Sequence, residues 1–171
     1  EYLLFYRMGD FYELFFKDAE IAASNLGIAL TKRGKLGDKD IPMCGVPYHS
    51  AQTYLSRLIK QGFKVAIAEQ LEESDSDIKK NQKIFKRDVV RIITPGTIIE
   101  DSLLDDKNNN NLASVYFYKG EISLAWVDMT AGVIKLEHIG GKNFLQDFTE
   151  SIQKIEPGEI IISESIKNSK I

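Results

Sequence analysis

The most suggestive chemistry lies in the stretch GDFYELF, where Phe11 and Glu13 stand two residues apart just after a Gly-Asp pair. Asp10 and Glu13 have the spacing of a capping box, which predicts a helix beginning here with both carboxylates near its positive end. Phe11 lies off the apolar stripe of that helix and is free to be exposed. An exposed ring beside an acid could wedge between base steps from the minor groove of a duplex and kink it. Both interpretations of the stretch stay open on the pattern alone.

The metal-binding and nucleophilic residue types do not assemble into a known motif. Cys44 and His49 are close together, but a zinc site needs about four ligands and the only other histidine is His138. We therefore expect Cys44 to be structural and His49 to lie on the surface. The sequence contains no Ser/His/Asp arrangement, phosphate loop or dinucleotide fingerprint.

Asp128, at the end of the apolar run in WVDMT, is the one acid with a catalytic alternative. A carboxylate at a strand end could bind Mg²⁺ in a nucleic-acid hydrolase, although such an enzyme needs several converging acids. We favour the simpler interpretation that Asp128 starts the turn DMTAG.

The first half of the chain predicts an α/β domain. The aromatic-rich run of residues 2–8 predicts a strand. The spacing of the apolar residues between Tyr12 and Asn25 predicts a helix that ends at Gly27. The proline-containing stretch 41–50 predicts an ordered loop, after which Ser50 caps a second helix. The remaining predicted strands of this half are 28–33, 64–70 and 89–95.

The second half follows a different pattern. The stretch 94–111 contains a Pro-Gly break and a run of four Asn, which we interpret as an exposed spacer. A meander with a tight turn at Lys119-Gly120 follows, then a helix at about 142–154 and a strand, 159–163, expected to be buried on both sides. The predicted domains are residues 1–95 and 112–171, joined by a linker over 96–111. The meander strands are 112–118, 121–129 and 132–139.

Composition fits one globular domain, or one domain plus part of another, in 171 residues with 43% apolar and 27% charged side chains. The abrupt apolar start suggests a fragment of a longer protein. No apolar run reaches the length of a membrane span, and a single cysteine favours a reducing, cytoplasmic setting. The net charge of −3 excludes a uniformly basic surface, but two basic stretches, 32–39 and 79–91, could meet phosphates or simply be solvated loops.

Six segments resemble bacterial MutS, the family of DNA mismatch recognition proteins, and they occur in the order seen in that family. WVDMTAG is similar to the opening of the family's connector domain, so the resemblance covers essentially the whole chain. The segments are GDFYELF, LTKRG, IPMCGVPYHS, YLSRLIKQG, VAIAEQ and VVRIITPGT.

The resemblance implies a role for individual residues. Phe11 is expected to stack on a mispaired base from the minor groove, and Glu13 to hydrogen-bond to that base. Because Glu13 cannot do this while bound in a capping box, its side chain is expected to be free or to rearrange on binding. Residues that flank the DNA or hold the reader loop are expected at Arg7, Met8, Lys32, Arg33, Pro42, Met43, Tyr48, His49 and Arg91.

The resemblance also implies an architecture and partners. The fold class is α/β (α+β): a mixed-sheet mismatch-recognition domain with flanking helices, then part of an RNase H-like connector without nuclease activity. The expected ligand is double-stranded DNA containing mismatched or unpaired bases. No catalytic residue, metal or cofactor is expected in this chain, because ATP and Mg²⁺ belong to a C-terminal domain of the full-length protein. That protein is expected to be a cytoplasmic, nucleoid-associated homodimer that meets downstream repair proteins through the connector.

Two alternatives from other classes remain at this point. A metal-dependent hydrolase on the second domain predicts Mg²⁺-dependent cleavage that Asp128→Asn abolishes. A protein-interaction module, for which the second domain is the better candidate, predicts binding to other proteins and not to DNA.

Overall fold

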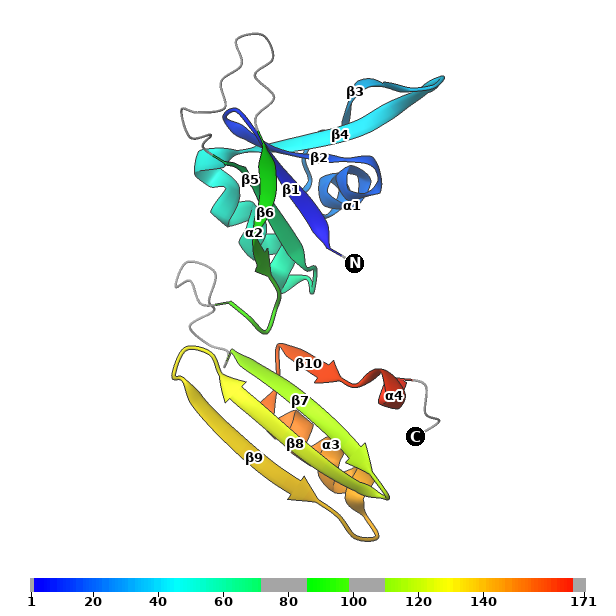
Figure 1. Cartoon of the computed structure of the whole chain (residues 1–171), viewed down its shortest axis with the longest axis vertical. Coiled ribbons are helices and arrows are strands. Elements are labelled where there is room, and N and C mark those ends of the chain that lie inside the picture. The colour runs from blue at the N-terminus through cyan, green and yellow to red at the C-terminus, as the bar shows by residue number, and fades with distance from the viewer. Residues whose placement is uncertain (1, 72–85, 99–109, 168–171) are drawn as a thin grey trace. The chain divides into compact units, whose positions relative to one another are not determined.

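The computed structural model describes residues 2–71, 86–98 and 110–167 (Figure 1). Contacts divide the chain into two compact units, Glu1–Ile93 and Thr94–Ile171. Both units combine a mixed sheet with helices, which confirms the predicted α/β (α+β) class.

A six-stranded mixed sheet forms the first unit, with strand order β3-β4-β2-β1-β5-β6. β1 runs parallel to β5, and the other neighbouring pairs are antiparallel. This order places β2 in the interior of the sheet, between β1 and β4. The strands are β1 (Leu3–Met8), β2 (Phe11–Phe15), β3 (Thr31–Leu36), β4 (Lys39–Pro47), β5 (Val65–Gln70) and β6 (Arg87–Ile93).

Helices α1 (Phe16–Leu26) and α2 (Ala51–Lys60) pack together over one face of this sheet, and the short 3₁₀ turn η1 (Tyr48–Ser50) leads into α2 (Figure 1). The apolar side chains of α2 form one stripe that is buried at Ala51, Leu55, Leu58 and Ile59 and half-buried at Tyr54. The opposite face carries exposed apolar side chains, so the described residues leave it largely uncovered. The core beneath the helices includes Phe5, Leu14, Ala19, Leu26, Val46, Leu55 and Leu58.

The predicted helix from Tyr12 is wrong in its first turn, because residues 11–15 form β2. Tyr12 and Leu14 are buried while Phe11 is exposed, which is the two-residue alternation of a strand. The helix begins at Phe16 after an extended Phe15 that makes no side-chain cap, so the capping box does not form. The predicted end is confirmed, since Gly27 adopts φ 68° and its N–H donates to the Ala23 carbonyl at 2.9 Å.

The loop predicted over 41–50 is also wrong, because most of it belongs to β4. Pro42 is opposite Lys32 of β3, beyond the end of β2, and Pro47 is opposite Phe11 of β2, beyond the start of β3. At each proline β4 therefore has a neighbouring strand on one side only. The missing proline N–H then costs the sheet no hydrogen bond between strands. Ser50 precedes α2 as predicted, but its hydroxyl donates to the Pro47 carbonyl and caps nothing.

The second unit is a four-stranded sheet in the order β10-β7-β8-β9, with α3 (Phe144–Ile155) packed on one face and a last short helix, α4 (Glu164–Lys167). The predicted meander and the turn at Lys119-Gly120 are confirmed. The core comprises Ala113, Val115, Ile122, Leu124, Ile139 and Ile155. The strands are β7 (Asn111–Tyr118), β8 (Glu121–Asp128), β9 (Val133–Ile139) and β10 (Glu159–Ile162).

Two predictions about this unit need correction. Asn110 and Asn111 are buried rather than exposed spacer, because their side-chain amides donate to the carbonyls of Ile98 and Ile155. The preceding residues, 107–109, lie outside the described ranges. β10 is exposed instead of buried on both sides, because it forms an edge beside β7 while α3 packs over β8 and β9.

Gly158 provides a test of packing in the second unit. A Cβ added there would lie 2.8 Å from the Pro95 carbonyl oxygen, a backbone atom that cannot move aside alone. We expect Gly158→Ala to lower the free energy of unfolding by about 1–3 kcal/mol. Trp126, the single tryptophan, reports the transition by fluorescence during urea unfolding.

Gly140→Ala is the matched control for this variant. Its added Cβ would meet only the side chains of Glu121 and His138, at 3.5 Å or more. Equal stability of the two variants would contradict the packing argument.

Candidate nucleic-acid interface

Phe11 stands at the end of a tight hairpin rather than at a helix start. Met8 and Phe11 are the last paired residues of β1 and β2, so Gly9 and Asp10 alone make the turn. Gly9 adopts φ 57°, as the first of the two central residues of a type II′ turn requires. The Asp10 carbonyl accepts a 2.8 Å hydrogen bond from the Tyr48 N–H, which ties the turn to η1. The Phe11 ring is 47% exposed on this anchored turn.

Glu13 is two residues further along β2 and therefore on the same face as Phe11. Its direct neighbours across the sheet are Tyr6 and Gly45. A Cβ on Gly45 would lie 3.7 Å from the Phe11 ring and 3.8 Å from Glu13 Cγ. Gly45 thus leaves free space beside both side chains. Sequence reasoning missed this role, because it depends on pairing across β4.

The Glu13 carboxylate does not reach Asp10 and is not free. Both of its oxygens accept hydrogen bonds from Arg33 Nη1, an ion pair whose Glu13 side chain is 13% exposed. Arg33 comes from β3, on the far side of β4. The expectation of a free side chain is therefore wrong for the protein alone.

Arg7 lies on the opposite, helix-covered side of the sheet. Its register partner is Tyr12, whose side chain is buried. The Arg7 guanidinium is 3.4 Å from the centroid of the Tyr48 ring and 5.5 Å from that of Tyr12. Arg7 Nη1 is buried and has no hydrogen-bond partner among the described residues. Arg7 therefore supports the residue that anchors the Asp10 turn.

A hollow of about 420 Å³ adjoins this cluster and is lined in part by Tyr48, His49, Glu69 and Arg91. The Tyr12 hydroxyl donates a hydrogen bond to the Glu69 carboxylate. Burial, reinforced by that bond, raises the pKa of Tyr12 above its usual range, so the phenol stays protonated. The result is a polar layer directly beneath the strand that carries Phe11.

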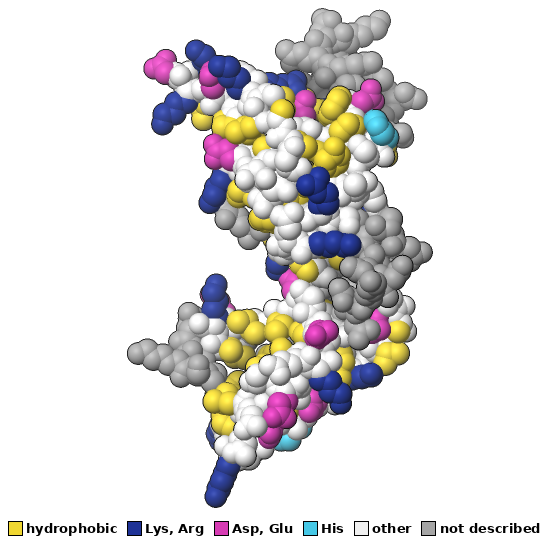
Figure 2. Space-filling view, turned by 180° about the vertical axis from the view of Figure 1, so that it is seen from behind, with side chains coloured by type: hydrophobic (Ala, Val, Ile, Leu, Met, Phe, Trp, Pro, Cys, Tyr) yellow, Lys and Arg dark blue, Asp and Glu magenta, His cyan; other side chains and the backbone are white. Residues whose placement is uncertain are grey.

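The β3–β4 hairpin carries basic and acidic side chains near its far end (Figure 2). Lys32 bonds Asp40 at 2.8 Å, and that carboxylate raises the pKa of Lys32. Both side chains are well exposed, so this ion pair contributes little to stability. Of the second basic stretch, residues 79–85 lie outside the described ranges.

The residues expected at the site thus fall into three places. Tyr12 and Glu69 also lie on the helix-covered side of the sheet, although the sequence pattern did not single them out. Only the pairing of their strands brings them there. Strand register and contacts assign Met8, Phe11, Glu13, Met43 and Arg33 to the uncovered face, Arg7, Tyr48, His49 and Arg91 to the helix-covered side, and Lys32 and Pro42 to paired positions of the hairpin.

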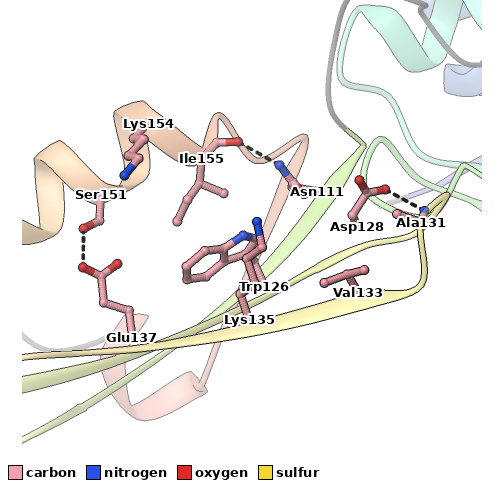
Figure 3. Close-up of a pocket in the computed structure, with 10 residues that line it drawn as sticks. All are labelled: Asn111, Trp126, Asp128, Ala131, Val133, Lys135, Glu137, Ser151, Lys154 and Ile155. Atoms are coloured by element: carbon pink, nitrogen blue, oxygen red, sulfur yellow. Dashed lines mark hydrogen bonds between the residues drawn. The ribbon is translucent and has the colours of Figure 1, made fainter.

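In the second unit, Asp128 starts a turn, as favoured from the sequence. One carboxylate oxygen accepts from the Thr130 N–H, the Thr130 hydroxyl and the Ala131 N–H at 2.6–3.1 Å. The Thr130 hydroxyl is the main cause of a lowered pKa of Asp128, and the Ala131 amide adds to it. Asp128 borders a hollow of about 390 Å³ beneath α3, where Ser151 donates to Glu137 (Figure 3).

Cys44 is buried in the first unit, as expected for a structural cysteine, and burial raises its pKa to about 11. Its thiolate is therefore scarce at neutral pH, and the side chain packs as a small apolar group. His49 lies on the surface, as expected. The described ranges contain no cluster of three or more acid, His or Cys side chains suited to a metal ion.

The first unit is thus an α/β domain with an exposed ring and a carboxylate on the uncovered face of its mixed sheet, beside a charged hairpin. The family model for MutS domain I matches residues 1–102. Accordingly, the chain belongs to the MutS family.

Relatives in three bacteria extend the match to nearly the whole chain. DNA mismatch repair protein MutS of Wolbachia pipientis wMel is 52% identical over 165 residues, covering 96% of this chain and 19% of that protein. The proteins of the same name in Anaplasma phagocytophilum (strain HZ) and Bradyrhizobium sp. (strain ORS 278) are 46% and 45% identical, covering 99% and 96% of this chain and 20% and 18% of their own. The chain thus spans about a fifth of the length of these relatives.

Among the described residues, none of the helices has the length and apolar character that a membrane span requires.

The exposure of Phe11 leads to a prediction about stability. Because Phe11 is only about half buried, Phe11→Ala should lower the free energy of unfolding of the first unit by less than about 1 kcal/mol, the range of strand preferences. Phe5→Ala, which removes a fully buried ring from the same sheet, should cost about 3–5 kcal/mol. Urea unfolding followed by circular dichroism compares the two variants; similar losses would contradict the exposed geometry.

Proposed function

We propose that this chain is the mismatch-recognition part of a bacterial DNA mismatch repair protein and binds mismatched or unpaired bases in duplex DNA. Phe11 enters the minor groove and stacks on the mispaired base, Glu13 hydrogen-bonds to it, and the duplex kinks. The observation that carries the proposal is the half-exposed Phe11 ring on an anchored turn, with Glu13 two residues away on the same face.

The physical basis of discrimination is the cost of opening the stack. A mismatched or unpaired base has already lost part of its pairing energy, so displacing it costs less than displacing a Watson–Crick partner. The protein then reads deformability more than the pattern of base edges. On paired DNA the Glu13 carboxylate gains no hydrogen bond from a base, so this contact favours only the mismatched duplex.

Around this site we propose the domain assignment predicted above. Residues 1–95 are the recognition domain, 96–111 the linker, and 112–171 the first part of an RNase H-like connector. The chain itself is non-catalytic. The full-length protein is an ATP-dependent homodimer that acts on DNA in the bacterial cytoplasm and nucleoid, and its connector meets downstream repair proteins.

The proposal is tested by competition binding of the full-length protein to duplexes with and without a mismatch. Stacking of one base on an aromatic ring is worth about 1–3 kcal/mol, which is roughly 5- to 150-fold in Kd. We expect Phe11→Ala to lose that affinity on the mismatched duplex and with it the preference for mismatched DNA.

Phe16→Ala is the matched control, since Phe16 is another exposed phenylalanine of the same unit, at 52% exposure. It should retain the preference. A Phe11→Ala protein that still prefers the mismatched duplex by the wild-type factor would end the wedge proposal.

A further inference from the structure

The ion pair between Arg33 and Glu13 places a cation on the carboxylate that is proposed to read the base. Glu13 is nearly enclosed, at 13% side-chain exposure, whereas Arg33 is 50% exposed. Arg33 therefore has one side on Glu13 and the other toward solvent. A guanidinium binds phosphate oxygens with the same geometry as carboxylate oxygens. Glu13 and a DNA phosphate are thus competing ligands for one side chain.

The position of Arg33 is built into the hairpin. The register between β3 and β4 shifts between Lys32 and Lys35, so Arg33 and Gly34 form a bulge. Gly34 adopts φ 72°, a conformation that glycine tolerates at little cost. Bulges re-aim side chains, and this one accompanies the reach of Arg33 past β4 to β2. β4 offers no obstructing side chain opposite Glu13, because that residue is Gly45.

We propose that Arg33 is a specificity-determining residue that stays on Glu13 over paired DNA and moves to a backbone phosphate when a displaced base takes its place. This inference rests on the proposed function. Over a paired duplex no base donates to Glu13, so the ion pair persists and Arg33 makes no phosphate contact. Over a mismatch the base satisfies Glu13, and the released guanidinium adds one phosphate contact. Recognition of the base by Glu13 and binding of the DNA backbone by Arg33 are thereby coupled.

The salt dependence of binding reports this coupling directly. Each phosphate contact contributes about −0.9 to the slope of log K against log salt concentration. The full-length protein, free of nucleotide, should show a slope steeper by about 0.9 on mismatched than on paired duplex. Between 50 and 200 mM KCl its mismatch preference should therefore fall roughly 3- to 4-fold.

The variants separate the two roles of Arg33. In Arg33→Gln the slope difference between the two duplexes should vanish and the mismatch preference at low salt should fall. In Glu13→Gln the guanidinium is released on both duplexes, so the slope on paired DNA should steepen to that on mismatched DNA. In the Glu13→Gln background, Arg33→Gln should lower both slopes equally.

Lys35→Gln is the matched control, because Lys35 is an exposed lysine of the same strand, two residues beyond Arg33. It should leave the slope difference intact. The inference is overturned if Arg33→Gln lowers both slopes by the same amount, or changes neither, in the presence of Glu13. If Phe11→Ala removes the mismatch preference in the same assay, that outcome overturns the inference alone and leaves the proposed function standing.

Discussion

The pairing of β2 between β1 and β4 is the constraint on which the rest of the first unit depends. Side chains alternate along a strand, so fixing this register fixes which face each residue occupies. Tyr12 and Leu14 become part of the core under the helices, and Phe11 and Glu13 are left on the other face. A shift of one residue would bury the carboxylate and expose Leu14. The buried residues of β2 thus hold Phe11 and Glu13, the residues of the proposed site, in place.

The polar layer beneath β2 explains how an exposed ring can be positioned without being packed. Arg7 stacks on Tyr48, and the Tyr48 N–H holds the carbonyl of Asp10, next to Phe11. Each link uses a hydrogen bond or a cation–π contact on the far side of the sheet, so none of them covers the ring. In the proposed insertion into a base stack, a ring held this way would lose little conformational entropy, which would favour binding.

Much of this architecture follows from local sequence patterns, and the exceptions share one cause. The helical stripe of α2, the stop at Gly27 and the meander of the second unit were predictable because neighbours in the chain determine them. Residues 12–15 and 41–47 form strands where the sequence predicts a helix start and a loop, because their strand pairing joins distant segments. Prolines in β4 are tolerated only because its neighbours end there. The likeness to MutS selected Phe11 and Glu13 as the candidate site, but neither it nor the local pattern revealed the bond from Arg33.

Charge sets a limit on how the proposed site can work. A net charge of −3 means that the chain as a whole has no excess of positive charge to attract phosphate, so any attraction comes from local groups of basic side chains. Strong non-specific attraction would in any case work against discrimination, because it adds equally to binding of paired and mismatched DNA. While the Arg33 guanidinium is paired with Glu13, it is not available to bind a phosphate. Under this proposal, affinity for the DNA backbone grows only after Glu13 has bound a base, so the contact that strengthens binding also increases the preference for mismatched DNA.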